Sequence, residues 1–226
     1  MYLLSVDTAT NSGGVALSRN SEIVGLAMLK TPLEYSDRLI DYVDFLLDNS
    51  GLGIRDVGTF VVASGPGSFT GLRVGLAAVK AFCQALDRPA VAVSTLKALA
   101  WRHRHLAERV APMIDARRRQ IYGAVYRTED PEALEPEGAE IVGSPEEWLR
   151  STPESGCLYV GDAAQLYSGT IRAVRPAGRI LRTDNQILEA LCEIGFRRMS
   201  AGKALDAAQL KANYLRPSDA EASGES

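Results

Sequence analysis

The segment most suggestive of a binding or catalytic site is rich in glycine and extends from Ser64 to Gly75. Its sequence is Ser-Gly-Pro-Gly-Ser-Phe-Thr-Gly-Leu-Arg-Val-Gly. An apolar run, 57–63, precedes it and apolar residues at helical spacing follow, so we expect a strand, a tight turn and a helix over 70–86. Backbone N–H groups at a helix start can bind phosphate. A P-loop, however, needs lysine and then serine or threonine after its last glycine, and Leu72 and Arg73 stand there instead.

A stripe of small residues runs along the predicted helix. Gly71, Gly75 and Ala78 recur at i, i+4 and i+7, and each interior glycine costs about 1 kcal/mol of helix stability relative to alanine. That cost predicts that something approaches this face closely. A partner helix, a phosphate at the helix N-terminus and a second segment of the same chain would all satisfy the pattern. Ser68 and Thr70 are each placed to cap the helix.

Asp7 is the second candidate, at the end of an apolar strand pattern and followed by Thr8, Ala9 and Thr10. A carboxylate with neighbouring hydroxyls could hold a Mg²⁺-nucleotide. An aspartate that only caps its own turn is the favoured explanation. The candidate phosphate or nucleotide residues are Asp7, Thr8, Gly65, Gly67 and Ser68.

The chain offers no complete catalytic set and no metal-binding spacing. Its two histidines, His103 and His105, would point to different faces of a helix, and we expect both at the surface. The three cysteines are scattered in apolar patterns typical of reduced core thiols. The run 117–119 consists of three arginines, which could contact RNA phosphates, although a solvated hairpin turn is the favoured interpretation.

The composition is that of an ordinary globular protein, with 226 residues, 46% hydrophobic and 23% charged. A net charge of −3 argues against a protein that binds nucleic acid by itself. The first residues do not resemble a signal peptide, and no apolar run is long enough to span a bilayer. We therefore expect a cytoplasmic protein that does not bind membranes.

Short strands and one helix are expected before the glycine-rich run. The patterns predict an antiparallel meander of strands over 2–7, 13–18 and 23–29, and then a helix over 36–49. After the central strand and helix, a strand over 90–93 leads into a helix that Ser94 or Thr95 caps and that continues through Trp101.

The second half begins like the first. A strand over 110–115 again ends in a carboxylate, and a strand over 121–126 returns. Asp7 and Gly14 are separated by 7 positions and Asp115 and Gly123 by 8, which indicates an internal duplication. A capping box at Ser144 opens a short helix. A strand follows over 157–160, Asp162 caps the next stretch, and Asp184 caps the longest helix of this half, which ends at Gly202.

We therefore predict an N-terminal lobe over 1–108 and a smaller C-terminal lobe over 109–202. Residues 203–216 should pack back on the body. Residues 217–226 are dominated by small, polar and acidic residues and predict a disordered tail.

Several motifs resemble the TsaB (YeaZ) family, from residue 2 to residue 216 and in the right order. They are Val6-Asp-Thr-Ala-Thr10, the central run from Gly65 to Gly75, Val93-Ser-Thr-Leu96, Asp115-Ala-Arg117 and Tyr214-Leu-Arg216. The resemblance implies an α/β fold with the two lobes of actin-like ATPases and sugar kinases (ASKHA), each a mixed sheet flanked by helices. It also implies action with TsaD and the ATPase TsaE. Together these proteins place a threonylcarbamoyl group on the adenosine next to the anticodon of tRNAs that read ANN codons.

The resemblance also implies that this chain is a non-catalytic paralogue of TsaD. TsaD proteins bind their catalytic metal with a His-x-x-x-His pair, and Thr95 and Leu99 occupy the corresponding positions here. One departure from the family is Tyr35-Ser36, where many relatives have His-Ser. We predict no catalytic residue, no metal and no cofactor for the chain alone, with ATP or ADP and Mg²⁺ at an interface with partners.

The preferred interpretation is a pseudo-enzyme that binds TsaD as a heterodimer, acts with TsaE, and meets tRNA only through the complex. Alone, the same surface would form a homodimer. A stand-alone ATP-dependent kinase, or a peptidase acting on its partner, is the rival; direct tRNA binding is disfavoured by the net charge. The predicted partner interface comprises Ser36, Leu39, Ile40, Val43, Leu47, Thr70, Gly71, Val74, Gly75, Ala78 and Phe82.

Overall fold

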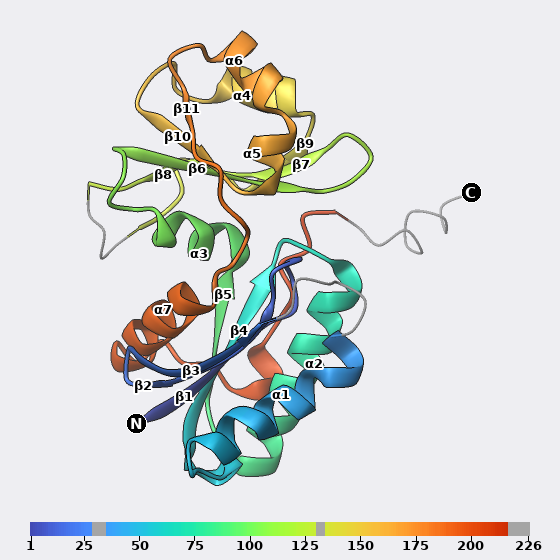
Figure 1. Ribbon diagram of the computed structural model, residues 1–226, viewed down its shortest axis with the longest axis vertical. Helices are drawn as coiled ribbons and strands as arrows, with labels where there is room; N and C mark the ends of the chain where they lie inside the picture. Colours follow the sequence, from blue (N-terminus) through green and yellow to red (C-terminus); the bar gives the residue numbers. More distant parts are fainter. Residues whose placement is uncertain (29–34, 130–133, 217–226) are drawn as a thin grey trace. The chain divides into compact units, whose positions relative to one another are not determined.

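The computed structural model describes residues 1–28, 35–129 and 134–216, and the predicted tail over 217–226 lies outside these ranges. Two units are present. The first combines residues 1–98 with 186–212, and the second combines 99–185 with the residues from Asn213 on. Each unit has its own sheet (Figure 1).

The sheet of the first unit has the strand order β3-β2-β1-β4-β5. Its strands are β1 (Tyr2–Asp7), β2 (Gly14–Arg19), β3 (Glu22–Met28), β4 (Val57–Gly65) and β5 (Ala90–Ser94). The first three form antiparallel pairs, which confirms the predicted meander, and β4 and β5 continue the sheet in parallel with β1.

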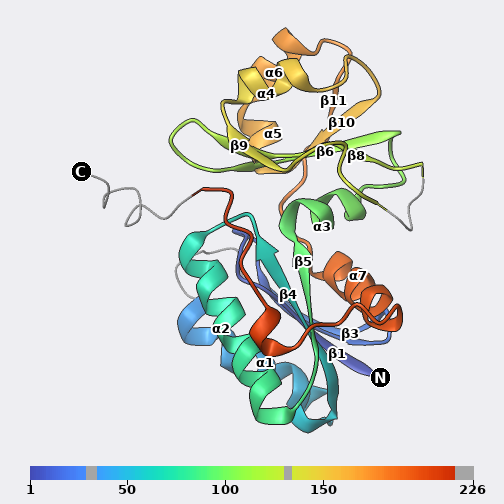
Figure 2. The same ribbon diagram turned by 180° about the vertical axis from the view of Figure 1, so that it is seen from behind.

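Helices cover both faces of this sheet. Because side chains alternate along a strand, Leu4 and Val6 of β1 point to one face, where they share a core with α1 (Tyr35–Asn49) and α2 (Phe69–Leu86). Ser5 points to the other face and meets α7 (Leu188–Ser200) there. Figures 1 and 2 show α7 on the opposite side of the sheet from α1 and α2.

The position of α7 corrects the predicted lobe boundary at residue 202. Cys192 donates a hydrogen bond to the Ser5 hydroxyl (3.3 Å), and Arg198 donates to the Ala92 carbonyl (2.6 Å). A Cβ at Gly195 would overlap the side chain of Val61 in β4. The helix therefore belongs to the first unit although its sequence follows the second. It begins at Leu188 with Ile187 at the N-cap, and Asp184 does not cap it.

The sheet of the second unit has the order β11-β10-β6-β7-β9, and β8 (Tyr126–Arg127) also pairs with β6. Its other strands are β6 (Arg109–Asp115), β7 (Ile121–Gly123), β9 (Ile141–Gly143), β10 (Cys157–Val160) and β11 (Arg179–Ile180). Three short helices accompany them, α4 (Pro145–Ser151), α5 (Asp162–Leu166) and α6 (Ser168–Val174). Ser144 stands at the N-cap of α4, but its side chain makes no capping hydrogen bond.

The two units repeat one topology. In the first, β1 pairs antiparallel with β2 and parallel with β4; in the second, β6 pairs antiparallel with β7 and parallel with β10. Each half also runs through three or four strands, a helix, a strand, one or two helices, a strand and a final helix, the first half ending with α3 (Thr95–Arg102). This is the predicted actin-like ATPase and sugar-kinase fold, and the duplication indicated by the two strand-end aspartates extends to the whole sheet.

The segment after α7 packs on the first unit, as expected. Leu205 and Ala90 exchange backbone hydrogen bonds of 2.7 and 2.8 Å, and Leu210 is fully buried. The segment contains a short 3₁₀ helix, Ala207–Gln209. In the described part of the chain, one helix, α2, is long and apolar enough to cross a membrane by length and composition alone; its inner side chains Leu72, Leu76, Val79 and Cys83 lie in the core.

Candidate functional site

The glycine-rich turn joins β4 to α2, and the helix begins as its capping residue predicts. Ser68 stands at the N-cap, and its hydroxyl accepts a hydrogen bond from the Gly71 amide at 3.2 Å. Thr70 lies inside the helix and does not cap it, since α2 begins at Phe69. The Ser68 amide donates in turn to the Ala9 carbonyl at 2.9 Å. The turn is thus bound directly to the loop after β1.

The glycine stripe faces that same loop. A Cβ at Gly71 would overlap the Thr8 carbonyl oxygen, and a Cβ at Gly75 would overlap the Thr8 hydroxyl. Thr8 Oγ1 also donates to the Gly71 carbonyl at 2.7 Å. Of the three alternatives that the spacing allowed, a second segment of the same chain is therefore the one that approaches these glycines.

The predicted partner interface is consequently wrong at five positions. Gly71 and Gly75 are buried against the β1 loop. The α1 residues of the prediction point into the core of the first unit, where they are 2–3% exposed: Leu39, Val43 and Leu47. Apolar residues at helical spacing mark the buried side of a helix as readily as a docking side. The side chain of Ser36 lies outside the described part of the structure.

The remaining residues of the prediction lie on the outer side of the two helices. Ile40 of α1 is 49% exposed, and Thr70 is exposed while Val74, Ala78 and Phe82 are half-buried. Together with the exposed Ala77 and Ala81 they form what we term the α1–α2 face. Only two of the 18 residues of α2, Arg73 and Lys80, are charged, and Arg73 stacks over the Phe69 ring at 3.9 Å. The outer side of α2 therefore also carries mostly uncharged residues, although it does not face the core of the first unit.

Asp7 caps the turn that follows β1, as favoured from the sequence. Its Oδ1 accepts from the amides of Ala9 (2.8 Å) and Thr10 (3.3 Å), and its Oδ2 accepts from the Thr10 hydroxyl (2.6 Å). The carboxylate is fully buried. Burial raises the pKa of Asp7 to about 6, although the hydrogen bonds from Thr10 and Ala9 lower it.

This arrangement does not fit a Mg²⁺-nucleotide held by the chain alone. Both oxygens of Asp7 are already used by the turn, and Mg²⁺ requires accessible oxygen ligands and bound waters. Three amides at the start of α2 are also used, because Ser68 N–H donates to the Ala9 carbonyl, Gly71 N–H to the Ser68 hydroxyl and Leu72 N–H to the Ser68 carbonyl. A phosphate bound to the Ser68, Gly71 or Leu72 amide would have to displace these contacts.

The two positions that correspond to the metal pair of TsaD are enclosed. Thr95 and Leu99 are both fully buried. The Thr95 hydroxyl has no hydrogen-bond partner among the described residues. The Leu99 side chain lies 3.0 Å from where a Cβ of Gly161 would stand. The Leu99 side chain has no atom that could ligate a metal.

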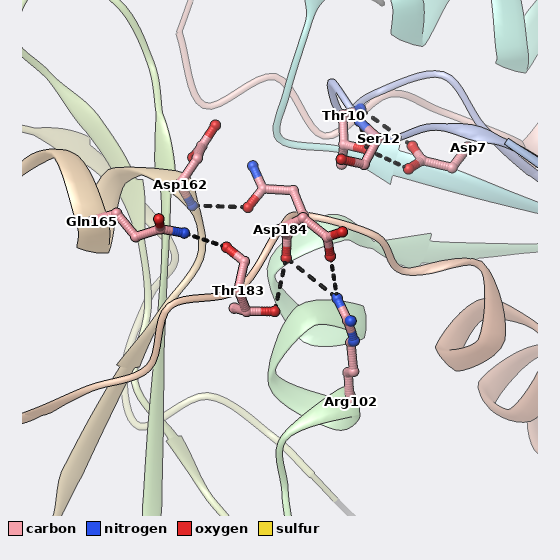
Figure 3. Close-up of polar contacts among 9 residues, drawn as sticks. Asp7, Thr10, Ser12, Arg102, Asp162, Gln165, Thr183 and Asp184 are labelled. Carbon is pink, nitrogen blue, oxygen red and sulfur yellow. Dashed lines mark hydrogen bonds and ion pairs between the residues drawn. The ribbon is translucent and has the colours of Figure 1, made fainter. Parts of the chain in front are cut away.

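Polar contacts unforeseen from the sequence join the loops that follow the strands of the second unit (Figure 3). Asp162 Oδ1 accepts from the Asp115 amide (3.1 Å), and Asn185 Oδ1 accepts from the Asp162 amide (2.9 Å). Arg102 forms an ion pair with Asp184 at 2.7 Å. The available sequence signal was Gly161-Asp162 directly after a strand, in a position like that of Gly65 at the end of β4 in the first half. These contacts position loops and offer no nucleophile.

His103 differs from its prediction. It is 7% exposed, so it is buried and not a surface residue, whereas His105 is exposed as expected. Burial, with a smaller contribution from Arg102, lowers the pKa of His103 to about 4, and Asp184 opposes the shift. The imidazole is therefore neutral at pH 7.

The C-terminal motif packs on the second unit, as predicted for the last ordered residues. Arg216 donates to the Ala116 carbonyl at 3.0 Å and to the Gln120 side chain, and Asn213 donates to Glu140 at 2.7 Å. Ala116 and Gln120 flank the exposed turn 117–119, which is the predicted hairpin turn. No metal-binding group of three or more His, Cys, Asp or Glu side chains occurs within 1–28, 35–129 and 134–216.

Known proteins resemble this chain over its length. Residues 30–173 match the family model described as "TsaD: tRNA N6-adenosine threonylcarbamoyltransferase". The tRNA threonylcarbamoyladenosine biosynthesis protein TsaB of Bacillus subtilis is 31% identical over 98% of this chain and 97% of its own. The Escherichia coli TsaB is 34% identical over 65% of this chain and 64% of its own.

A solved structure agrees with the sequence relatives. The crystal structure of a Pseudomonas aeruginosa protein described as similar to peptidase YEAZ superposes with a TM-score of 0.79 and 30% identity, covering 95% of this chain and 99% of the other. With near-complete coverage in both sequence and fold, the chain belongs to the TsaB (YeaZ) family, within the wider family that the TsaD model describes.

Proposed function

We propose that this chain is a non-catalytic subunit of the assembly that makes threonylcarbamoyladenosine in tRNA. It binds a TsaD-like partner through the α1–α2 face and works with the ATPase TsaE. The transfer itself takes place on the TsaD-like subunit, and tRNA is bound by the assembly. The observation that carries this proposal is the full-length match to a protein named for that biosynthesis.

The non-catalytic role is supported by two places where a nucleotide or metal would be expected, the end of β1 and the helix α3. At the strand end, both oxygens of Asp7 are occupied by the turn. In α3, buried Leu99 stands at one position of the metal pair. A kinase or ATPase acting alone would need an accessible carboxylate for Mg²⁺ at such a site. On this proposal, any ATP or ADP with Mg²⁺ lies at an interface with partners, which supply the missing ligands.

The role of the α1–α2 face is supported by its composition. Thr70, Ala77, Ala78 and Ala81 leave little side-chain volume on the outside of α2, so a second helix can approach closely. A contiguous exposed apolar surface on a protein often marks an interaction site. In the isolated chain the same face would bring two copies together as a homodimer.

The experiment is a reconstitution from purified components with omission of one component at a time. We expect threonylcarbamoyladenosine, measured by mass spectrometry of digested tRNA, only when this chain, its TsaD-like partner and TsaE are present with ATP. Undiminished product without this chain would contradict the proposal. ATP hydrolysis by the isolated chain at an ordinary enzyme rate of about 1 s⁻¹ or more would favour the kinase-like alternative, and cleavage of the partner would favour the peptidase.

A further inference from the structure

The turn between β6 and β7 carries three successive arginines in an unusual backbone conformation. Arg117, Arg118 and Arg119 have φ values of 62°, 53° and 59°, in the left-handed region that residues with a Cβ rarely adopt. All three are exposed. We call these residues the arginine turn.

The conformation is held from several directions. The Arg117 amide donates to Asp115 Oδ1 at 2.9 Å, and the Gln120 amide donates to the Arg117 carbonyl at 2.9 Å. The Ala116 amide donates to the Gln120 carbonyl at 3.0 Å. Arg216, from the C-terminal segment, binds both ends of the turn through the Ala116 carbonyl and the Gln120 side chain. The turn is therefore a fixed feature of the second unit.

The residue types do not follow from the conformation. Turns with positive φ are ordinarily built from glycine, asparagine or aspartate, which adopt that region at lower cost. Three arginines stand here instead, so three charged side chains occupy a turn that local backbone preference would give to other residues. Strained segments of this kind concentrate at functional sites.

The charge of the arginine turn contrasts with that of the chain. The protein has 25 basic and 28 acidic residues, yet the three side chains of the turn and the adjoining Arg216 gather four guanidinium groups in one place. Carboxylates in contact with this region include Asp115, whose Oδ2 lies 3.5 Å from Arg117, and Asp162, which accepts from the Asp115 amide. A local positive site on an acidic protein suits a polyanion, and guanidinium groups match phosphate geometry.

We propose that the arginine turn contacts the phosphate backbone of tRNA when this chain is part of its assembly, an inference that rests on the proposed function. The exposed guanidinium groups of the arginine turn make the contact. Because the groups recognised are phosphates, the contact adds affinity and orientation and does not read the base sequence. The overall net charge keeps the isolated chain a weak RNA binder.

The test compares two double variants in the full assembly of this chain and its TsaD-like partner. Arg118→Gln/Arg119→Gln removes two charges from the turn. Arg172→Gln/Arg182→Gln removes two charges from exposed arginines elsewhere in the second unit. The Kd for labelled tRNA is measured by fluorescence anisotropy between about 50 and 200 mM salt, with melting temperature and partner affinity measured for each variant.

Two lost phosphate contacts should weaken tRNA binding roughly 10- to 60-fold at about 0.1 M salt and reduce the slope of log K against log salt by about 1.4–1.8. The control should stay within about twofold of wild type. Equal affinities and slopes for the two variants would overturn the inference, as would loss of partner affinity in the turn variant, because the turn would then be a protein contact. A wild-type assembly that neither binds nor modifies tRNA would overturn the proposed function as well.

Discussion

Two oxygen atoms of Thr8 explain why α2 has glycine at positions 71 and 75. The Thr8 carbonyl and hydroxyl oxygens occupy the space that side chains at Gly71 and Gly75 would fill. The glycines therefore allow the β1 loop to lie directly on the helix, and their cost to helix stability is offset by this packing. A sequence spacing reveals that something approaches closely, but it does not reveal whether the approaching atoms belong to the same chain.

We expect Gly71→Ala to destabilise the first unit by about 1–3 kcal/mol, because the new Cβ meets backbone that cannot move aside alone. The matched control is Gly169→Ala in α6, where nothing lies within 4 Å of the added atom; there alanine should be neutral or stabilising by up to about 1 kcal/mol. Denaturant unfolding of both variants measures the difference. Equal stabilities would show that the β1 loop yields to the extra methyl group.

The buried Asp7 makes stability depend on pH in an unusual direction. Its pKa is raised to about 6 in the folded chain from about 4 when unfolded, so the folded state binds the proton more tightly. Stability from this group is therefore complete below pH 4 and is lost as the pH rises to 6. We expect Asp7→Asn to be more stable than wild type at pH 7, by up to about 3 kcal/mol, and to lose that advantage between pH 6 and 4. Chemical denaturation across this range tests the sign, and a pH-independent difference would contradict it.

At the scale of elements, local patterns were sufficient where neighbours in sequence are neighbours in space. The meander and the Ser68 cap follow from short-range spacing and turn chemistry. The assignment of α7 failed because its apolar stripe predicts a buried face and does not identify the sheet that buries it. The surface prediction for His103 failed for a related reason: this residue lies in the turn after α3, and its charged neighbours in sequence do not show that the turn is covered.

Arg216 should fasten the β6–β7 turn from a distance of about 100 residues along the chain. We expect Arg216→Ala to increase amide hydrogen exchange around Ala116 and Gln120 and to lower stability by about 1.5–3 kcal/mol, the range for hydrogen bonds to a charged group. Lys211→Ala, at an exposed position of the same segment, serves as the control and should leave exchange unchanged. Comparable exchange in the two variants would argue against the fastening role.

At the scale of the whole molecule, one topology occurs twice, and the first strand of each unit ends in an aspartate. In both units that aspartate is used within the protein: Asp7 closes its own turn, and Asp115 binds Arg117. The fold could be predicted because the family motifs occur in the right order from residue 2 to residue 216, and the repeated pattern of strand, aspartate and strand agreed with it. The partner surface could be predicted only in part. Both α1 and α2 carry apolar residues on the side that faces the core and on the side that faces outward, and the spacing does not distinguish the two sides.

The most direct measurement of the central claim, that the α1–α2 face binds a TsaD-like partner, compares the partner affinity of Ile40→Lys and Leu166→Lys. Both replace an exposed aliphatic side chain (49% and 61% exposed) with lysine, one on the α1–α2 face and one on α5. By isothermal titration calorimetry, we expect Ile40→Lys to stay folded and to bind the partner at least about tenfold more weakly, equivalent to about 1.4 kcal/mol, while Leu166→Lys binds like wild type. Unchanged affinity for Ile40→Lys, or an equal loss in both variants, would contradict the account.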